Sequence, residues 1–565
     1  MGKDERLNTS SEIKRIFPRV KEGMENAGPT IFTENGMSYY DNSEAHTLIV
    51  GSTGTGKSNT PAGSMGNIEN ISKAKENLIM IDPKGEGIGK YGNELIEKGY
   101  EVKCIDFDTP GKSPTSWNPL EYIRKLYTSL SREDNDFAAA MLNEFAKSIY
   151  PNNKNADPFW TDSAAEFFIG CVYLLLENAD TAEINLNSID FIMQSADAKI
   201  GASTYMKECY KILDDGSMAK RYLATYVNAP NDTRMSIFSV AKNGVATFAQ
   251  SKGLMNMLNN DNLNIYELDV DKPFALFIVK PDENKTYDAL CGFLITQLTQ
   301  HFIKLARKRY NGKLPVKLHV ILEELGSLGA SITNLPNLMV ASRSRNIRLC
   351  LVLQSYSQLE DIYGKSQSET ILSSVGVTIA FSTNNWDTLE EWSHKCGNRT
   401  IYENGSRYTE PILTPNQIAA MPVATALILI RGRMKWVCKF PILKREVQKL
   451  NFPVTERNED IKTFDLKKVV DKYKELKRAE LFEANSSKSP FSTQSSDEDT
   501  KSISFEEIMK HLHNDSEKST EIILNEVDDD DVSDDKINDM LSNIEKEISN
   551  MPDFTEWITN DNEEE

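Results

Sequence analysis

The segment TLIVGSTGTGKS, residues 47–58, limits the possible folds of this chain more than any other stretch. It fits the pattern G-x-x-x-x-G-K-[ST] in full, directly after a short apolar run. Glycines in such a loop let backbone N–H groups approach phosphate oxygens, and the helix that follows directs its positive end toward them. The pattern therefore predicts a P-loop between a strand at residues 47–51 and a helix that follows Lys57.

The loop also predicts the groups that hold a nucleotide. Lys57 would neutralise charge on the β- and γ-phosphates, and the Ser58 hydroxyl would bind Mg²⁺. The pattern alone indicates ATP or GTP. The predicted nucleotide-binding residues are Gly51, Ser52, Thr53, Gly54, Thr55, Gly56, Lys57, Ser58 and Asn59.

Strand-like and helix-like segments alternate on both sides of a long helical stretch. Apolar runs at 77–82 and 100–107 follow the P-loop, and further runs appear at 273–281, 316–325 and 347–355. This alternation is typical of an α/β fold with a mostly parallel central sheet. The predicted parts are an N-terminal segment (1–46), a discontinuous nucleotide-binding domain (47–120 and 246–450), an all-α insertion (121–245), a charged helix (451–485) and a flexible acidic tail (486–565).

The formal net charge of −20 is unevenly distributed. Residues 526–565 hold sixteen acidic residues and two lysines, a net of −14, which leaves −6 for the rest of the chain. The overall charge therefore does not argue against nucleic-acid binding by the folded part. The seven cysteines form no C-x-x-C pair, and no run of 18 apolar residues occurs. We therefore expect reduced thiols and a cytoplasmic location.

A carboxylate pair completes the predicted catalytic site. The run LHVILEELGSLG, residues 318–329, places Glu323 and Glu324 at the end of a strand. Glu323 would hold the Mg²⁺ shell, and Glu324 would polarise the attacking water. Gln354 ends the next strand, where its amide would sense the γ-phosphate or position water. A helix-capping role for the acidic pair is the alternative interpretation.

Three arginines precede the strand that ends at Gln354. Arg343, Arg345 or Arg348 would act as an arginine finger in the nucleotide site of a neighbouring subunit. Each is equally open to interpretation as a solvated surface arginine. A basic stretch at residues 304–313 would contact DNA phosphates, or would simply form the solvated end of a helix.

Several motifs together resemble the coupling-protein ATPases of type IV secretion and conjugation (TraG/TraD-like). They are GSTGTGKS, IMIDPKGE (79–86), SWNPL (116–120), DPFWTDSAAEF (157–167), VILEELGSLG (320–329), residues 342–364 and residues 412–433, in the family's order. The resemblance covers about residues 45–440. Glu323 departs from it, because the family usually has Asp at this position.

The resemblance implies a RecA-like P-loop ATPase with an inserted all-α domain, using ATP and Mg²⁺ and assembling as a homo-hexamer. It implies delivery of DNA–relaxase or protein substrates to a secretion channel, with secretion-channel ATPases as partners. It assigns Lys57 and Ser58 to nucleotide and Mg²⁺, Glu323 and Glu324 to the acidic motif, Gln354 to the sensor and Arg343 to the arginine acting in trans. Most members begin with transmembrane helices, so we expect a separate membrane protein to hold this chain at the inner face of the bacterial membrane.

Two other functions fit the same motifs. One is a DNA translocase of the FtsK/SpoIIIE kind, which the acidic C-terminus disfavours. The other is a nucleotide-gated adaptor that presents substrates to another motor without hydrolysing ATP. The presence of Glu323 in place of the usual Asp is compatible with the adaptor function, which therefore stays an alternative.

Overall fold

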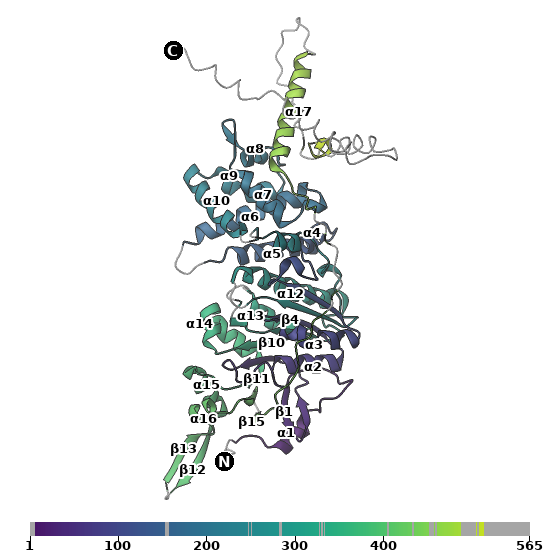
Figure 1. Ribbon diagram of the computed structural model, residues 1–565. Helices are drawn as coiled ribbons and strands as arrows, with labels where there is room; N and C mark the ends of the chain where they lie inside the picture. Colours follow the sequence, from purple (N-terminus) through teal and green to yellow (C-terminus); the bar gives the residue numbers. More distant parts are fainter. Residues whose placement is uncertain are drawn as a thin grey trace, which may run out of the picture. The chain divides into compact units, whose positions relative to one another are not determined.

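The computed structural model describes residues 6–152, 157–246, 248–249, 251–281, 285–326, 328, 332, 334–403, 406–431, 434–450, 452, 457, 460–486, 504 and 508–512. The chain divides into two units, Met1–Val470 and Asp471–Glu565. The acidic tail predicted for 486–565 lies almost wholly outside the described residues. The fold below is that of the first unit (Figure 1).

A large, mostly parallel sheet forms the centre of the first unit. Within the described residues it has nine strands in the order β15-β14-β11-β3-β10-β9-β4-β8-β5, and only β14 and β15 are antiparallel to their neighbours. The strands are β3 (His46–Val50), β4 (Asn77–Asp82), β5 (Glu101–Asp106), β8 (Phe274–Val279), β9 (Leu318–Leu322), β10 (Ile347–Leu353), β11 (Val375–Ala380), β14 (Thr425–Ile430) and β15 (Met434–Lys439). Strands β3, β4, β9 and β10 are buried along their whole length, which explains their continuous apolar runs. The α/β prediction is confirmed.

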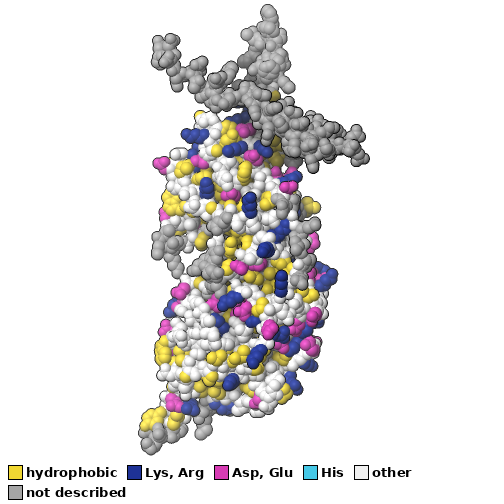
Figure 2. Space-filling model, viewed as in Figure 1, with side chains coloured by type: hydrophobic (Ala, Val, Ile, Leu, Met, Phe, Trp, Pro, Cys, Tyr) yellow, Lys and Arg dark blue, Asp and Glu magenta, His cyan; other side chains and the backbone are white. Residues whose placement is uncertain are grey.

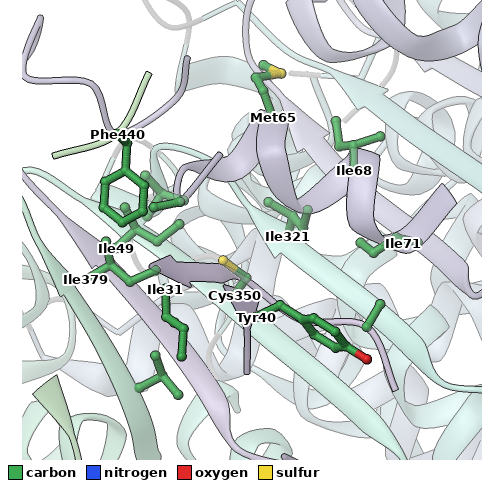
Figure 3. Packing of buried hydrophobic residues seen from close by; sticks show 14 of the residues in the cluster. Ile31, Tyr40, Ile49, Met65, Ile68, Ile71, Ile321, Cys350, Ile379 and Phe440 are labelled. Carbon is green, nitrogen blue, oxygen red and sulfur yellow. The ribbon is translucent and has the colours of Figure 1, made fainter. Parts of the chain in front are cut away.

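One face of the sheet carries a core that joins segments far apart in the sequence (Figure 3). Helix α2 (Ser64–Ala74) contributes Ile68 and Ile71, and α3 (Glu86–Glu97) contributes Leu95. The N-terminal hairpin of β1 (Thr30–Glu34) and β2 (Met37–Tyr40) adds Ile31 and Tyr40. Its turn, Asn35-Gly36, has positive φ at both residues, as the sequence pattern predicts. A short helix, α1 (Ser10–Ile16), precedes this hairpin.

The region between β5 and β8 is helical, apart from one short ribbon. Its helices are α4 (Pro119–Tyr127), α5 (Arg132–Ile149), α6 (Pro158–Asn178), α7 (Leu186–Ala196), α8 (Tyr205–Ile212), α9 (Met218–Asn228), α10 (Asn231–Ala246) and α11 (Lys252–Asn259), with 3-10 turns η1 (Pro110–Lys112), η2 (Thr181–Glu183) and η3 (Ile265–Glu267). The ribbon pairs β6 (Lys199–Ile200) with β7 (Ser203–Thr204). Phe145 of α5 stacks on Phe293 of α12 (Asp288–Arg309), with ring centroids 4.2 Å apart, so this region packs against a helix of the sheet domain.

Helix α6 is long and apolar. By these two criteria alone it is the one helix among the described residues that could cross a membrane. However, 72% of its most apolar window is buried inside the protein, as expected for a core helix. Residues Phe167, Phe168 and Leu174 are fully buried within the helical region. The apolar character of α6 is therefore explained by packing.

The remaining elements connect or follow the sheet strands. They are η4 (Lys285–Tyr287), α13 (Leu335–Arg343), α14 (Ser357–Ser374), α15 (Trp386–Cys396), a hairpin of β12 (Asn398–Glu403) and β13 (Ser406–Pro411), α16 (Pro415–Ala419) and α17 (Leu466–Ser486). The charged helix predicted for 451–485 begins only at Leu466. Just before it, the backbone N–H of Phe464 donates to Ser188 Oγ at 3.0 Å and the Phe464 ring is buried. Phe464 thus packs against the helical region just before α17 begins.

Candidate functional site

The P-loop lies at the carboxyl end of β3, between two other parallel strands. The backbone N–H of Gly51 donates to Leu353 O at the end of β10, and Phe381 N–H donates to Val50 O. Gly54 and Gly56 have φ of +83° and +109°, conformations that favour glycine. The loop is thus held by strands from both sides, as the sequence pattern predicts for its position after a strand.

The helix after the P-loop begins later than predicted. Helix α2 starts at Ser64, and residues 57–63 form a compact loop in which Ser64 N–H donates to Lys57 O and Met65 N–H to Ser58 O. Pro61 lies within this loop and removes a backbone donor. The prediction of a helix directly after Lys57 was therefore wrong by about two turns, and the loop itself brings Lys57 and Ser58 to the site.

A pocket of about 420 Å³ opens at this edge of the sheet. Its lining combines the P-loop with residues that follow β4, β9 and β10. The lining residues are Thr53, Gly54, Gly56, Lys57, Ser58, Asn59, Met65, Asp82, Pro83, Lys84, Glu86, Glu323, Glu324, Gln354, Val423 and Ile442. The structure thus brings together the P-loop, both glutamates and Gln354, which are widely separated in the sequence. Gly51, Ser52 and Thr55 belong to the same loop but do not line this pocket.

Glu323 and Ser58 form the part of the site suited to a divalent cation. Ser58 Oγ donates to Glu323 Oε1 at 2.6 Å. Oε2 of Glu323 is buried and has no hydrogen-bond partner among the described residues. Burial raises the pKa of Glu323 to about 7; the Ser58 hydrogen bond opposes this shift and the nearby Asp82 carboxyl adds to it. A hydroxyl and a carboxylate with a free oxygen are ligands that Mg²⁺ accepts.

Asp82 is a second buried carboxyl at the same edge, at the end of β4. Its Oδ2 accepts the backbone N–H of Ile88 at 2.9 Å, at the start of α3. Burial raises the pKa of Asp82 to about 6, and the backbone hydrogen bonds from Ile88 and Gly87 oppose this shift. Asp82 therefore lies in the lining of the same pocket as the P-loop.

Glu324 connects the P-loop lysine to the residue predicted as the sensor. Lys57 Nζ lies 3.3 Å from Glu324 Oε2, and Gln354 Nε2 donates to Glu324 Oε1. The backbone of Glu324 has φ of +54°, an uncommon conformation for a non-glycine residue that clusters at functional sites. The three side chains therefore form one connected polar group at the floor of the pocket.

The three candidate arginines differ in their surroundings. Arg348 is buried in β10, where it pairs with Asp41 and donates to the backbone oxygens of Ala27 and Asp41. It therefore serves the packing of the N-terminal segment and cannot reach a neighbouring molecule. Arg345 is half-buried and donates to Ala341 O. Arg343 is exposed at the end of α13 and does not line the pocket of its own chain.

The basic stretch 304–313 is largely neutralised within the chain. Lys304 and Lys308 both pair with Asp134, at 2.6 and 2.7 Å. Arg309 pairs with Asp269, and Lys313 pairs with Glu44 at 2.5 Å. These pairs favour a structural role for the stretch over DNA binding. Figure 2 shows basic and acidic side chains interspersed over the face in view, so no extended basic surface is seen on that side.

Seven lining residues were not predicted as site residues: Met65, Asp82, Pro83, Lys84, Glu86, Val423 and Ile442. Lys84 and Glu86 belong to the IMIDPKGE motif, which also contains Asp82, and their place in this motif was a usable signal. Val423 precedes β14 and Ile442 follows β15. Ile442 belongs to no motif, and the 412–433 motif that contains Val423 does not indicate its place in the pocket, which depends on the antiparallel pairing of β14 with β11 and β15.

Comparison with known proteins gives one family and a set of similar folds. The family model described as "Type IV secretory system Conjugative DNA transfer" matches residues 5–439, which is most of the chain. Comparison with curated protein sequences finds no match.

The similar structures include the plasmid coupling protein TrwB. TrwB in complex with ADP and Mg²⁺ matches with a TM-score of 0.57 and 17% identity, over 79% of this chain and 95% of that one. TrwB with a non-hydrolysable ATP analogue gives 0.57 and 17%, over 80% and 97%. TrwB with a non-hydrolysable GTP analogue gives 0.55 and 17%, over 80% and 97%. At this identity the similarity establishes the shared fold alone.

Proposed function

Because this chain belongs to the conjugative DNA transfer family of type IV secretory systems, we propose that it is an ATP-hydrolysing coupling protein. In this proposal it recruits a DNA–relaxase or protein substrate and drives its delivery to the transfer channel. The observation that carries the proposal is the convergence of Lys57, Ser58, Glu323, Glu324 and Gln354 on one pocket. In the proposed assembly, a homo-hexamer, each chain contributes one such site. The hexamer lies at the inner face of the cell membrane, beside secretion-channel ATPases and a membrane-protein partner.

The proposed cofactors are ATP and Mg²⁺. TrwB, which shares the fold, has been solved with ADP and Mg²⁺ and with an ATP analogue. Here Ser58 and the free oxygen of Glu323 would hold the cation. The bound cation would neutralise charge on the β- and γ-phosphates. Glu323 is one methylene longer than the usual Asp, and its side chain contacts Ser58, the other proposed cation ligand, at 2.6 Å.

The remaining residues have separate roles in the proposed hydrolysis. Lys57 would leave Glu324 and bind phosphate oxygens when nucleotide enters, since Lys57 is buried and the anion supplies a stronger partner. Glu324 would then orient and polarise water, with Gln354 holding one of its oxygens. Asp82 lines the same pocket, and burial raises its pKa to about 6.

The test compares ATP hydrolysis by the full chain with two variants. Glu324→Gln should reduce turnover at least about 100-fold while ATP binding persists, because the side chain keeps its size and loses its base function. Lys57→Ala should lose both binding and turnover. Gln194→Glu, on exposed helix surface far from the pocket, is the matched amide–carboxylate control and should change neither. If the unaltered chain binds ATP but shows no turnover with any DNA or protein substrate, the motor proposal fails and the non-hydrolysing adaptor replaces it.

A further inference from the structure

Two large apolar side chains are exposed at the rim of the nucleotide pocket. Val423 is 58% exposed and Ile442 is 57% exposed, and both line the pocket. The rest of the lining is dominated by glycines and by polar or charged groups. Exposed aliphatic groups are common on protein surfaces, but two that face one ligand pocket from different segments indicate an apolar ligand surface.

Backbone hydrogen bonds fix the segment of Val423 to the P-loop. Its neighbour Ala424 donates from its N–H to Thr55 O at 2.9 Å. A Cβ on Gly56 would meet Ala424 Cα at 3.1 Å, which shows how closely the two backbones approach. Ala424 has φ of +63°, a conformation that costs about 1 kcal/mol for a non-glycine residue. The position of Val423 is therefore held by the surrounding structure.

The segment of Ile442 is fixed to the other end of the P-loop. Leu443 N–H donates to Asn59 O at 2.9 Å. Farther along the segment, Arg445 pairs with Glu94 of α3 and lies 4.3 Å from the centre of the Tyr91 ring. These contacts anchor residues 441–450 along α3, so that Ile442 is held beside Asn59 without needing a ligand.

Two polar side chains at this end of the pocket, Asn59 and Glu86, already contact Lys90. Lys90 Nζ donates to Asn59 Oδ1 at 3.0 Å and also pairs with Glu86. Selective recognition of a base edge requires donors and acceptors that are free to pair with it. The side chains of Asn59 and Glu86 are instead tied to Lys90, whereas the methyl groups of Val423 and Ile442 are open to contact.

The order of contacts along the loop gives the direction of a bound nucleotide. Lys57 contacts Glu324 and Ser58 contacts Glu323, so the phosphates and cation belong at this end. Asn59 follows, and beyond it lies Ile442. Resting on the nucleotide-binding function proposed above, we propose that Val423 and Ile442 form an apolar clamp for the nucleobase. The clamp adds affinity for purine nucleotides and does not discriminate between adenine and guanine.

The test measures equilibrium binding of ATP, GTP and tripolyphosphate by calorimetry to the full chain with Mg²⁺. Val423→Ala and Ile442→Ala should each weaken ATP and GTP binding by a similar factor, roughly three- to tenfold, because each removes methyl groups from contact with the base. Tripolyphosphate has no base, so its affinity should stay within about twofold of the unaltered chain. The unaltered chain should bind ATP and GTP within a few-fold of each other.

Val447→Ala is the matched control. Val447 lies on the same segment and is 62% exposed, but it does not line the pocket. This variant should bind all three ligands normally. The clamp is refuted if the pocket variants keep normal ATP affinity, or if they lose tripolyphosphate binding to the same extent, which would indicate a damaged P-loop. A strong preference of the unaltered chain for one base overturns the claim of low selectivity. Absence of any nucleotide binding by the unaltered chain would instead refute the function proposed above.

Discussion

Asp261 is a carboxyl whose surroundings disfavour its charge, at the junction between the helical region and the sheet. It follows α11, and its Oδ1 lies 3.4 Å from the backbone N of Asn118 in the SWNPL motif. Burial raises the pKa of Asp261 to about 7, and the nearby Glu121 carboxylate adds to this shift. At pH 8 Asp261 is therefore ionised in the folded protein, where its charge costs more free energy than in the unfolded chain.

This shift predicts the pH dependence of an Asp261→Asn variant. The folded pKa lies above the unfolded one, so the stabilising effect of protonated Asp261 is complete below about pH 4 and is lost as pH rises through 7. The amide keeps an acceptor for Asn118 and cannot ionise. We expect Asp261→Asn to stabilise the fold by about 1–3 kcal/mol at pH 8 and by much less at pH 5. Denaturant unfolding at both pH values measures this, and an equal effect at the two would contradict the assignment.

At the scale of single elements, the late start of α2 depends on a glycine. A Cβ on Gly66 would meet Pro61 O at 2.2 Å and Pro61 Cα at 2.4 Å, so the loop 57–63 folds directly against the first turn of the helix. Alanine normally stabilises a helix by about 1 kcal/mol relative to glycine. At this position the order should be reversed, because the backbone of Pro61 cannot move without displacing the P-loop.

We therefore expect Gly66→Ala to destabilise the fold by about 2 kcal/mol or more and to weaken ATP binding. Gly216→Ala is the matched control, since Gly216 has no neighbour within 4 Å of an added Cβ and should change stability by less than about 0.5 kcal/mol. Denaturant unfolding and ATP titration of both variants measure the effect. A Gly66→Ala variant as stable as the unaltered chain would show that the loop is free to rearrange.

The elements differ in how well local sequence predicts them. Strands β4 and β10 coincide with the continuous apolar runs predicted at 77–82 and 347–355. The start of α2 was missed because the packing of Pro61 on Gly66, which is a matter of three-dimensional fit, outweighs the pattern. The hairpin of β12 and β13 was missed because it is rich in polar residues, and none of its side chains whose burial is described is buried.

At the scale of the whole molecule, the site was predictable to the extent that it follows from parallel strands. The carboxyl ends of β3, β10 and β9 meet at one edge, so residues after these strands gather there whatever their separation in sequence. This explains why Lys57, Glu324 and Gln354 could be associated from motifs. Val423 and Ile442 reach the pocket through antiparallel pairing at the far side of β3, and no local pattern encodes that pairing.

The same geometry separates Arg343 from the nucleotide site of its own chain. Arg343 precedes β10, whereas the P-loop contacts the end of β10 at Leu353. The seven residues of β10 span roughly 20 Å, more than an arginine side chain reaches. If Arg343 acts in hydrolysis, it therefore acts on a neighbouring chain, and Arg348, buried against Asp41, cannot take its place.

This arrangement predicts complementation between two inactive variants. Lys57→Ala lacks a working site but keeps Arg343, and Arg343→Ala keeps the site but lacks the arginine. Each alone should have at least about 1,000-fold reduced turnover, the low end of what such arginines contribute. When the two variants are co-assembled, the proposed homo-hexamer contains interfaces where an intact site meets an intact Arg343. ATP hydrolysis should then recover to a measurable fraction of the unaltered activity.

Controls connect that recovery to the interface. Arg343→Ala should bind ATP and unfold like the unaltered chain, because the Arg343 side chain is exposed at the end of α13. A mixture of Lys57→Ala with Glu324→Gln should recover nothing, since neither chain then holds a complete site of its own. Full activity of Arg343→Ala alone would remove this residue from the mechanism. If the mixture of Lys57→Ala and Arg343→Ala hydrolyses ATP no faster than the two variants measured separately, Arg343 does not act across the interface. Each site would then be complete within one chain.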